Sequence, residues 1–282
     1  MIFFFTGTGN SLEAARIIAD TTHDKLVDIG YANKTGRRSF SVEQGENLGF
    51  VFPVYAWSTP GIVDEFLRTV HFTTSNGNAF VPGYCYCTIT CGAFVGKTAT
   101  FFEELLKKYQ NIKLDASFSV KSVGNCVYMY NPADGEKREE LLAGARRSAK
   151  EVAYLIDNKR MVRQERRNPF GSLMSNFTCR EEKPRSIEPF NVIDDVCTGC
   201  GICASICPTN TIHMVKGRPV WSGDDCTQCL ACLHRCPVQA SQYGQKTVGR
   251  NRYTNPMLAG GTQPNQGASL SDALEEPIPE PE

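Results

Sequence analysis

The sequence predicts an α/β protein in which a doubly wound sheet of five parallel strands precedes a small α+β module rich in cysteine. Residues 1–160 alternate short apolar runs with longer amphipathic stretches, which is the pattern of strands and helices in a parallel sheet. Eight of the 13 cysteines lie between Cys197 and Cys236, in two blocks of equal spacing. A glycine-rich stretch follows the first apolar run and precedes a helical pattern, which is typical of a phosphate-binding turn.

Apolar runs predict the strands of the sheet, and the amphipathic stretches between them predict its helices. Several runs are apolar throughout, as expected of parallel strands that are buried on both faces. The expected strands are residues 2–5, 25–29, 48–54, 80–89 and 118–123, and the expected helices are residues 11–20, 60–70, 98–109 and 135–158. A ligand of such a sheet is expected beyond the carboxyl ends of the strands.

Shifts in composition divide the chain into four parts. Residues 1–160 form the α/β domain, and residues 161–189, which are polar and mixed in charge, are expected to be a linker. The cysteine-rich module spans residues 190–245. Residues 246–282 form a C-terminal extension with no basic residue after Arg252 and few large apolar ones, so most of it is expected to be disordered.

The overall composition excludes several classes of protein. The 30 basic residues balance the 30 acidic ones, so the charge gives no reason to expect a nucleic-acid partner. No apolar run approaches the roughly 20 residues of a membrane span, and the first residues lack the basic leader of a signal peptide. We therefore expect a cytoplasmic protein without a membrane span.

The two cysteine blocks have the spacing of an iron–sulfur site. Both read C-x2-C-x2-C-x3-C-P, the run in which three cysteines ligate one 4Fe–4S cluster and the fourth ligates the other. Zinc also accepts four thiolates, but zinc sites rarely need further cysteines at this spacing followed by proline. The predicted ligands are Cys197, Cys200, Cys203 and Cys236 for one cluster and Cys226, Cys229, Cys232 and Cys207 for the other. This module resembles the two-cluster bacterial ferredoxins at all eight ligand positions.

The glycine-rich stretch comprises Thr6, Gly7, Thr8, Gly9, Asn10 and Ser11. It is not a Walker A loop, because no lysine follows its glycines, and residues 92–98, which do contain a lysine, have one residue too few between theirs. It is not a dinucleotide fingerprint, because Leu12 stands in the place of the third glycine. Its pattern S/T-x-T-G-x-S/T resembles the phosphate loop of flavodoxins, where hydroxyl and backbone N–H groups surround the phosphate of FMN at a helix N-terminus.

Two further loops are expected to contact the flavin ring, because they follow the third and fourth expected strands. Tyr55 and Trp57 could stack on the ring or pack as ordinary side chains, and Cys91 and Gly92 could offer backbone groups to its edge. A third loop, residues 124–132, could line the same site or dock the cysteine-rich module. The full set of residues expected around the ring is Val54, Tyr55, Ala56, Trp57, Cys91, Gly92, Ala93 and Phe94.

Together these motifs resemble the family of bacterial ferredoxins whose N-terminal region is flavodoxin-like, over nearly the whole chain to about Pro256. The resemblance implies a flavodoxin-like sheet, FMN, two 4Fe–4S clusters and electron transfer between one-electron and two-electron redox partners. Protein donors and acceptors are expected. The alternative is an FMN-dependent reductase of a small molecule that receives electrons from the clusters, although no catalytic residue can be named.

The remaining cysteines and histidines are expected to have structural roles. Cys85, Cys87 and Cys126 lie in or beside apolar segments and are expected to be buried small hydrophobes. Cys179 is expected to be a thiol in the linker without a ligand role. His213 and His234 lie inside the module, where complete cysteine sets leave them no ligand position.

Overall fold

The computed structural model describes residues 1–75, 77–165, 169–178 and 186–259. Its central sheet has six parallel strands in the order β2-β1-β4-β6-β7-β8. The first five have the strand order 2-1-3-4-5 of flavodoxin-like folds, so the predicted fold class is confirmed. Their bounds are β1 Ile2–Phe4, β2 Leu26–Asp28, β4 Asn47–Pro53, β6 Tyr84–Cys91, β7 Ala116–Lys121 and β8 Arg163–Gln164.

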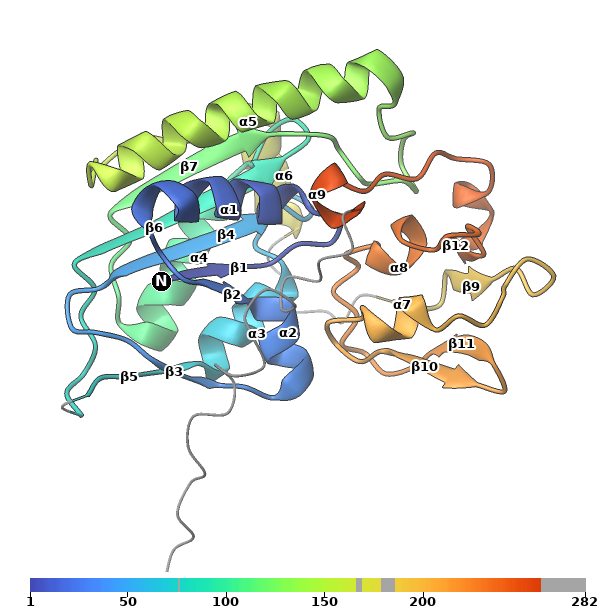
Figure 1. The fold of residues 1–282 in the computed structure, drawn as a ribbon, viewed down its shortest axis with the longest axis horizontal. Coiled ribbons are helices and arrows are strands. Elements are labelled where there is room, and N and C mark those ends of the chain that lie inside the picture. The colour runs from blue at the N-terminus through green and yellow to red at the C-terminus, as the bar shows by residue number, and fades with distance from the viewer. Residues whose placement is uncertain (76, 166–168, 179–185, 260–282) are drawn as a thin grey trace, which may run out of the picture.

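Helices cover both faces of this sheet (Figure 1). Helices α1 and α5 pack together on one face, and α2, α3 and α4 lie on the other. A short parallel pair, β3 and β5, extends the structure beside α2 and α3. The bounds are α1 Asn10–Thr22, α2 Ile29–Thr35, α3 Gly61–Thr69, α4 Thr98–Gln110, α5 Gly135–Asp157, β3 Ser39–Ser41 and β5 His71–Thr73.

Two apolar cores fill the spaces between the sheet and its helices. Side chains alternate between the faces of a strand, so Phe3 packs toward α3 while Phe4 packs toward α1. Strands β4 and β6 are almost wholly buried, which explains their continuous apolar character. These two cores fix the carboxyl ends of β1, β4, β6 and β7 at one edge of the sheet, where their loops meet.

The cysteine-rich module lies beyond that edge (Figure 1). It contains the antiparallel pair β9 and β12 and the antiparallel hairpin β10 and β11. Two one-turn helices, α7 and α8, follow equivalent positions in the two cysteine blocks. The bounds are β9 Phe190–Val192, α7 Ile202–Ser205, β10 Ile212–Val215, β11 Arg218–Trp221, α8 Ala231–His234, β12 Ser241–Tyr243 and the 3-10 turn Gly244–Thr247.

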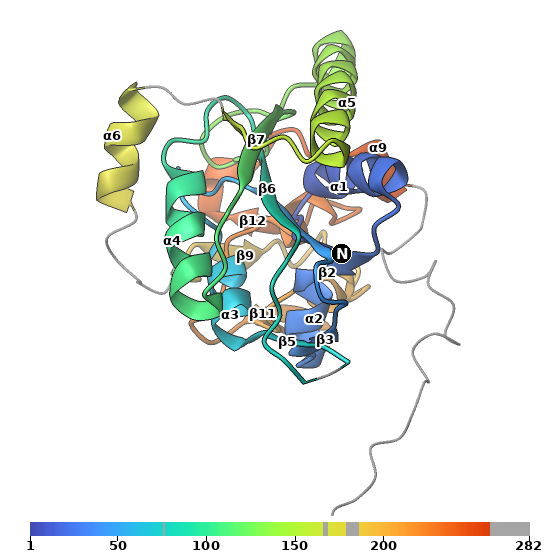
Figure 2. The same cartoon turned by 90° about the vertical axis from the view of Figure 1, so that its left-hand side faces the viewer.

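Several segments differ from the expectations. The expected strand 25–29 is shorter, because Ile29 already begins α2. The expected linker carries β8, which pairs with the sheet, and helix α6 (Pro169–Thr178), which stands beside α4 (Figure 2). Cys85 and Cys87 are buried as predicted, but Cys126 is only half-buried. Cys179 lies outside the described residues.

The first part of the C-terminal extension, up to Ala259, is ordered, which is compatible with an extension expected to be disordered over most of its length. Residues 248–259 return from the module to the α/β domain and end in helix α9 (Pro256–Ala259), which lies beside the start of α1 (Figure 1). Residues 260–282, where disorder was predicted, lie outside the described residues. Within the described part of the chain, no helix has both the length and the apolar character needed to cross a bilayer.

Candidate functional site

Four loops at the carboxyl edge of the sheet enclose a cavity of about 640 Å³, a size typical of cofactor pockets. We call it the flavin cavity, after the FMN that the sequence predicts at this edge of the sheet. The loops follow β1, β4, β6 and β7, which is where a doubly wound sheet binds its ligand. All the residues predicted to bind the cofactor line this cavity except Gly9: they are Thr6, Gly7, Thr8, Asn10, Ser11, Val54, Tyr55, Ala56, Trp57, Cys91, Gly92, Ala93 and Phe94.

The N-terminus of α1 supplies the electropositive end of the flavin cavity. The first N–H groups of an α-helix have no intrahelical partner, and the cap residue Gly9 has no side chain that could bond to those of α1. These groups and the helix dipole favour an anion. No charged side chain lines the cavity among the described residues. The residues therefore fit a phosphate that is held by neutral donors, as in the predicted FMN site.

The hydroxyls of the phosphate loop are engaged within the protein. Thr6 Oγ1 accepts a hydrogen bond from the Gly9 N–H at 2.9 Å, and Thr8 Oγ1 accepts one from Asn125 Nδ2 at 2.9 Å. The Ser11 hydroxyl pairs with that of Thr90 at 2.8 Å. These bonds fix the loop, and because Thr6 and Thr8 act as acceptors in them, their hydroxyl protons can still donate to a phosphate alongside the backbone N–H groups.

Gly7 and Gly9 of the phosphate loop leave room for the cysteine-rich module and for the C-terminal extension, which both pack closely against the loop. A Cβ atom at Gly7 would lie 2.5 Å from the carbonyl oxygen of Cys229. At Gly9, which has φ +100°, a Cβ atom would lie 2.7 Å from the Cβ of Asn255. The sequence associated both glycines with the phosphate, but close approach of the module and of the C-terminal return also demands them.

The loop after β4 forms a tight turn under strain. Ala56 and Trp57 both have left-handed φ values, 49° and 59°, and the backbone groups of Tyr55 and Ser58 pair across them. Two consecutive positive φ values define a type I′ turn, which normally favours Asn or Gly. The Trp57 carbonyl accepts from Ser175 Oγ at 2.9 Å, so α6 supports the turn. Strain of this kind is common at ligand sites.

The loop of residues 124–131 both lines the flavin cavity and docks the module. Asn125, Tyr128 and Tyr130 line the cavity. On its other side, Val127 is fully buried in the core of the module, and Tyr128 stacks on Tyr243 with ring centroids 4.8 Å apart. Both roles left open by the sequence are therefore filled by one loop.

His234 joins the module to this loop. Its Nδ1 accepts a hydrogen bond from the Tyr253 N–H at 3.1 Å, so the proton of the neutral ring is on Nε2, which donates to the Asn125 carbonyl at 2.7 Å. Burial lowers the pKa of His234 to about 4. The histidine is therefore a neutral structural bridge at physiological pH.

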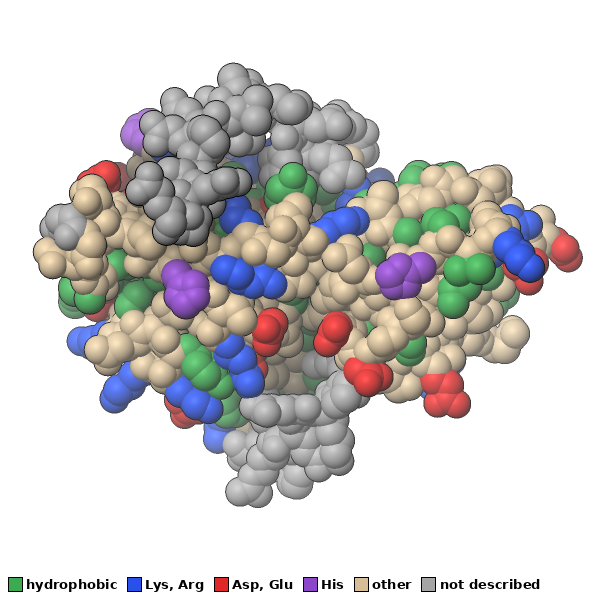
Figure 3. Space-filling view, turned by 90° about the horizontal axis from the view of Figure 1, so that it is seen from below, with side chains coloured by type: hydrophobic (Ala, Val, Ile, Leu, Met, Phe, Trp, Pro, Cys, Tyr) green, Lys and Arg blue, Asp and Glu red, His purple; other side chains and the backbone are tan. Residues whose placement is uncertain are grey.

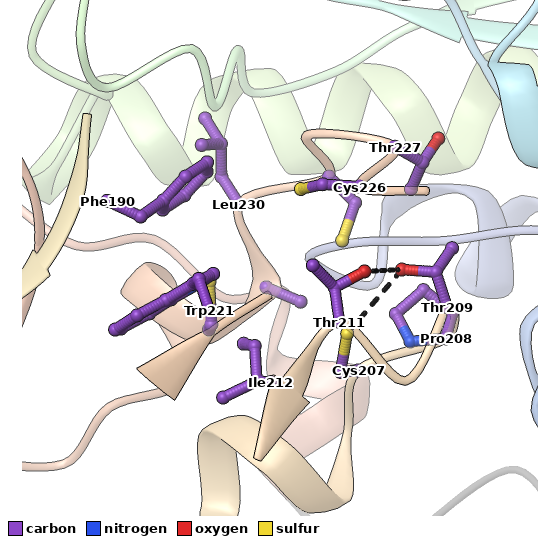
Figure 4. A pocket seen from close by; sticks show the side chains of 13 residues that line it. Phe190, Cys207, Pro208, Thr209, Thr211, Ile212, Trp221, Cys226, Thr227 and Leu230 are labelled. Atoms are coloured by element: carbon purple, nitrogen blue, oxygen red, sulfur yellow. Dashed lines mark hydrogen bonds between the residues drawn. The ribbon is translucent and has the colours of Figure 1, made fainter. Parts of the chain in front are cut away.

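The eight cysteines of the two blocks surround two separate cavities in the module. The inner set, Cys207, Cys226, Cys229 and Cys232, lines one of them (Figure 4). The outer set, Cys197, Cys200, Cys203 and Cys236, lines the other. Each set takes three cysteines from one block and the fourth from the other block. Within the described residues, no three His, Cys, Asp or Glu side chains converge on a single-ion site.

The inner cavity has unpaired donors that suit a cluster with inorganic sulfide. Thr227 Oγ1 and Trp221 Nε1 are buried without a hydrogen-bond partner among the described residues, and both residues line the cavity. A buried donor without a partner is costly, and an acceptor in the cavity would satisfy it. Beside Cys207, the Thr209 hydroxyl lies 3.6 Å from the sulfur and 2.7 Å from the Thr211 hydroxyl (Figure 4).

Burial controls the protonation of the inner cysteines. It raises the pKa of the Cys229 thiol to about 12 and that of the Cys232 thiol well above its ordinary value. Cys203 of the outer set is shifted in the same direction by the same cause. These thiols keep their protons until iron displaces them, so cluster assembly releases protons. The free energy of metal binding then also contributes to the stability of the folded module.

The flavin cavity and the inner cavity share a wall. Cys229 and Leu230 line both, and Gln228 lines the flavin cavity beside them. No described residue lines both the flavin cavity and the outer cavity. The order in space is therefore flavin cavity, inner set, outer set. Sequence patterns did not identify Gln228 or Leu230, because neither is a ligand type.

The fold and the site define a redox protein in which an α/β domain with flavodoxin-like strand order is joined to an iron–sulfur electron-transfer module. Residues 196–241 match the 4Fe-4S dicluster domain family, which holds two clusters with eight cysteines. The chain is 49% identical over 48 residues to Ferredoxin-1 of Rhodobacter capsulatus, covering 15% of this chain and 74% of that one. Through its C-terminal module, the chain belongs to the dicluster ferredoxins.

The chain is also similar to a polyferredoxin-like protein and, at low identity, to solved structures of oxidoreductases. An uncharacterised polyferredoxin-like protein of Methanocaldococcus jannaschii is 36% identical over 63 residues, which is 18% of this chain, and the chain spans only 38% of that protein's length. The solved structure of azoreductase AzrA aligns with 54% of this chain and 98% of its own, at 9% identity and a TM-score of 0.32. The NAD(P)H:quinone oxidoreductase from Methanothermobacter marburgensis aligns with 54% and 94%, at 12% identity and a TM-score of 0.29. The strand order, not these scores, defines the fold.

Proposed function

We propose that this protein transfers electrons between an FMN in the flavin cavity and the two 4Fe–4S clusters, and so links one-electron with two-electron redox partners. The shared wall carries the proposal: Cys229, a predicted ligand of the inner cluster, also lines the flavin cavity. When bound, FMN supplies redox chemistry in steps of one or two electrons, and each cluster supplies steps of one.

The residues of the chain would hold and separate the cofactors. The first N–H groups of α1 would bind the phosphate, and the loops after β4 and β6 would enclose the ring. Buried Leu230 makes the shared wall apolar, and an apolar wall excludes water from the path between the cofactors. The inner cluster would then be the direct neighbour of the flavin, with the outer cluster as the exit to a partner.

The surroundings of the outer set support a protein partner. Exposed apolar side chains border it: Val196, Met214 and Val238 are 42%, 37% and 36% exposed, and Val215 and Val220 lie on the adjoining hairpin. In the view from below, apolar side chains dot the right-hand half of the molecule, which the module forms (Figure 3). Exposed apolar groups gathered over a site mark contact surfaces.

Cofactor content and redox capacity test this function. Protein purified anaerobically should contain about one FMN with about eight iron and eight sulfide per chain, as the ligand count requires. Stepwise reduction should take up about four electrons per chain, two by the flavin and one by each cluster. Zinc in place of iron, or no FMN after reconstitution, would contradict the proposal.

A second candidate, reduction of a small molecule at the flavin, is favoured by the rim of the cavity. Phe94, Met129 and Tyr130 line the cavity and are 39%, 65% and 44% exposed, so a planar apolar molecule could enter beside them. The two functions differ in how the reduced protein is reoxidised. Saturable reoxidation by small quinone-like acceptors would support the reductase, and reoxidation by one-electron proteins alone would support the carrier.

A further inference from the structure

Residues 248–259, which we call the return segment, run from the module back to the phosphate loop (Figure 1). Two of its polar residues are enclosed at that point: Asn255 is 0% exposed and Tyr253 is 2% exposed. A polar side chain that is buried so completely must be fully hydrogen-bonded to be tolerated. Its partners therefore reveal what the segment does.

Asn255 bonds to three residues at the start of α1 or just before it. Its N–H donates to the Thr8 carbonyl at 2.8 Å. Its Nδ2 donates to Glu13 Oε2 at 2.8 Å and lies 3.3 Å from Asn10 Oδ1. Its Oδ1 accepts from the Met257 N–H at 2.9 Å and so caps α9. Because its Cβ also packs on Gly9, Asn255 holds the phosphate loop from the side away from the cavity.

Tyr253 and Glu13 complete this support. The Tyr253 hydroxyl donates to Asn10 Oδ1, and its N–H donates to His234 of α8 at 3.1 Å. The buried Glu13 carboxylate also accepts from Arg146 Nε of α5 at 2.6 Å. Asn10 in turn donates from Nδ2 to the Val123 carbonyl at 2.9 Å. The first residue of α1 is thereby tied to the loop after β7, to the return segment and, through Tyr253, to the cluster-bearing helix.

We propose that Asn255 is a positioning residue for the flavin phosphate: it holds residues 8–10 so that the first N–H groups of α1 point into the cavity. This inference rests on the proposed binding of FMN. Donors that are fixed before binding lose less entropy when the anion binds, so fixing them raises the affinity for the phosphate. The side-chain hydrogen bonds of Asn255 go to Asn10, Glu13 and Met257, and the first two act at the phosphate end of the cavity.

The test compares FMN with riboflavin, which has the same ring and no phosphate. Full-length protein with intact clusters is freed of flavin, and each flavin is titrated by quenching of its fluorescence. In Asn255→Ala, residues 8–10 are no longer held in place before binding, so we expect FMN to bind about tenfold more weakly, while riboflavin binds as it does to the wild type. Asn251→Ala is the matched control, since Asn251 lies in the same segment but its side chain bonds to exposed Asp134.

Iron content per chain shows whether a variant still folds around its clusters. If Asn255→Ala loses iron, Tyr253→Phe takes its place, because it removes only the hydroxyl that donates to Asn10, and the same selective loss of FMN is expected. Equal weakening of both flavins, or unchanged FMN affinity, would overturn the positioning role. Failure of the wild type to bind FMN would instead overturn the proposed function, and so the two failures are distinguishable.

Discussion

The two cysteine blocks have the same spacing, yet they occupy opposite environments. In the second block every residue from 229 to 234 is buried, whereas at the equivalent positions of the first block, 200–205, only Cys203 is buried. The second block packs against the α/β domain, and Cys229 and Ala231 belong to the main apolar core of that domain. The cysteine spacing therefore determines which kind of cofactor a block binds. The residues between the cysteines determine whether that cofactor lies against the α/β domain or near the surface.

The backbone of the blocks shows the same contrast. The first block has Gly199 and Gly201 at left-handed φ values of 72° and 73°, where the second has Gln228 and Leu230 at 50° and 60°. A side chain in this conformation costs about 1 kcal/mol or more, which glycine avoids. Both strained residues line the flavin cavity. The strain is retained where a side chain is needed to form the wall between the two sites.

The largest expected effect comes from separating the inner and outer sets by mutation. Cys207→Ser and Cys226→Ser should remove the same cluster, so the double variant should keep about half of the eight iron atoms. Cys207→Ser with Cys197→Ser should remove both clusters and leave almost none. Iron analysis of anaerobically purified protein measures this. If instead the Cys207→Ser, Cys226→Ser variant lost both clusters and the Cys207→Ser, Cys197→Ser variant kept one, each block would bind its own cluster. The division into inner and outer sets would then be wrong.

An exchange of side chains between the blocks should have a smaller effect. Leu230→Gly loses a buried side chain, worth about 2–3 kcal/mol, and regains about 1 kcal/mol of backbone strain, so we expect a net loss of stability and weaker FMN binding through the opened wall. Gly201→Leu adds about 1 kcal/mol of strain without comparable burial, because only Met214 approaches that position, and FMN binding should not change.

The midpoint of anaerobic thermal loss of cluster absorbance measures stability, and a fluorescence titration measures FMN affinity. The two variants serve as controls for each other, since both alter the residue before a one-turn helix. If Leu230→Gly and Gly201→Leu changed FMN affinity equally, Leu230 would not form a wall of the flavin cavity.

Apolar patterning was sufficient to predict most of the sheet. Strands β4 and β6 are buried on both faces, so their continuous apolar runs are easy to recognise in the sequence. The iron–sulfur module could be predicted from the cysteine spacing alone, with no knowledge of its fold. Strand β8 could not be predicted this way, because Arg163 and Gln164 are exposed polar residues whose strand conformation comes from pairing with β7.

The contacts of the return segment could not be predicted, because its buried residues are polar and have no period. One local signal does exist: Asn255 followed by Pro256 is a typical cap and first residue of a helix, and α9 begins there. The contacts of Asn255 with Thr8, Asn10 and Glu13 join positions more than 240 residues apart, which no local pattern can indicate. Long-range polar contacts are where sequence reasoning fell short.

The smallest expected effect concerns pH and a carboxyl group under the module. Asp28 ends β2 and accepts a hydrogen bond from the Tyr31 N–H at 3.2 Å. Burial raises its pKa from 3.8 to about 6, while the charge of Arg235 acts weakly in the opposite direction. In the second block Arg235 occupies the position that apolar Ile206 has in the first, so the positive charge near Asp28 is another difference between the blocks.

A raised pKa means that the folded protein holds this proton more tightly than the unfolded chain does. Wild-type stability should therefore fall as the pH rises from about 4 through 6, and Asp28→Asn should remove that fall. Because the carboxyl group is partly accessible, we expect a difference of about 1 kcal/mol between pH 5 and pH 7. Anaerobic denaturant midpoints of variant and wild type at both pH values measure it, with exposed Asp20→Asn as the control for loss of a charge. Parallel pH profiles of wild type and Asp28→Asn would show that burial under the module does not control this carboxyl group.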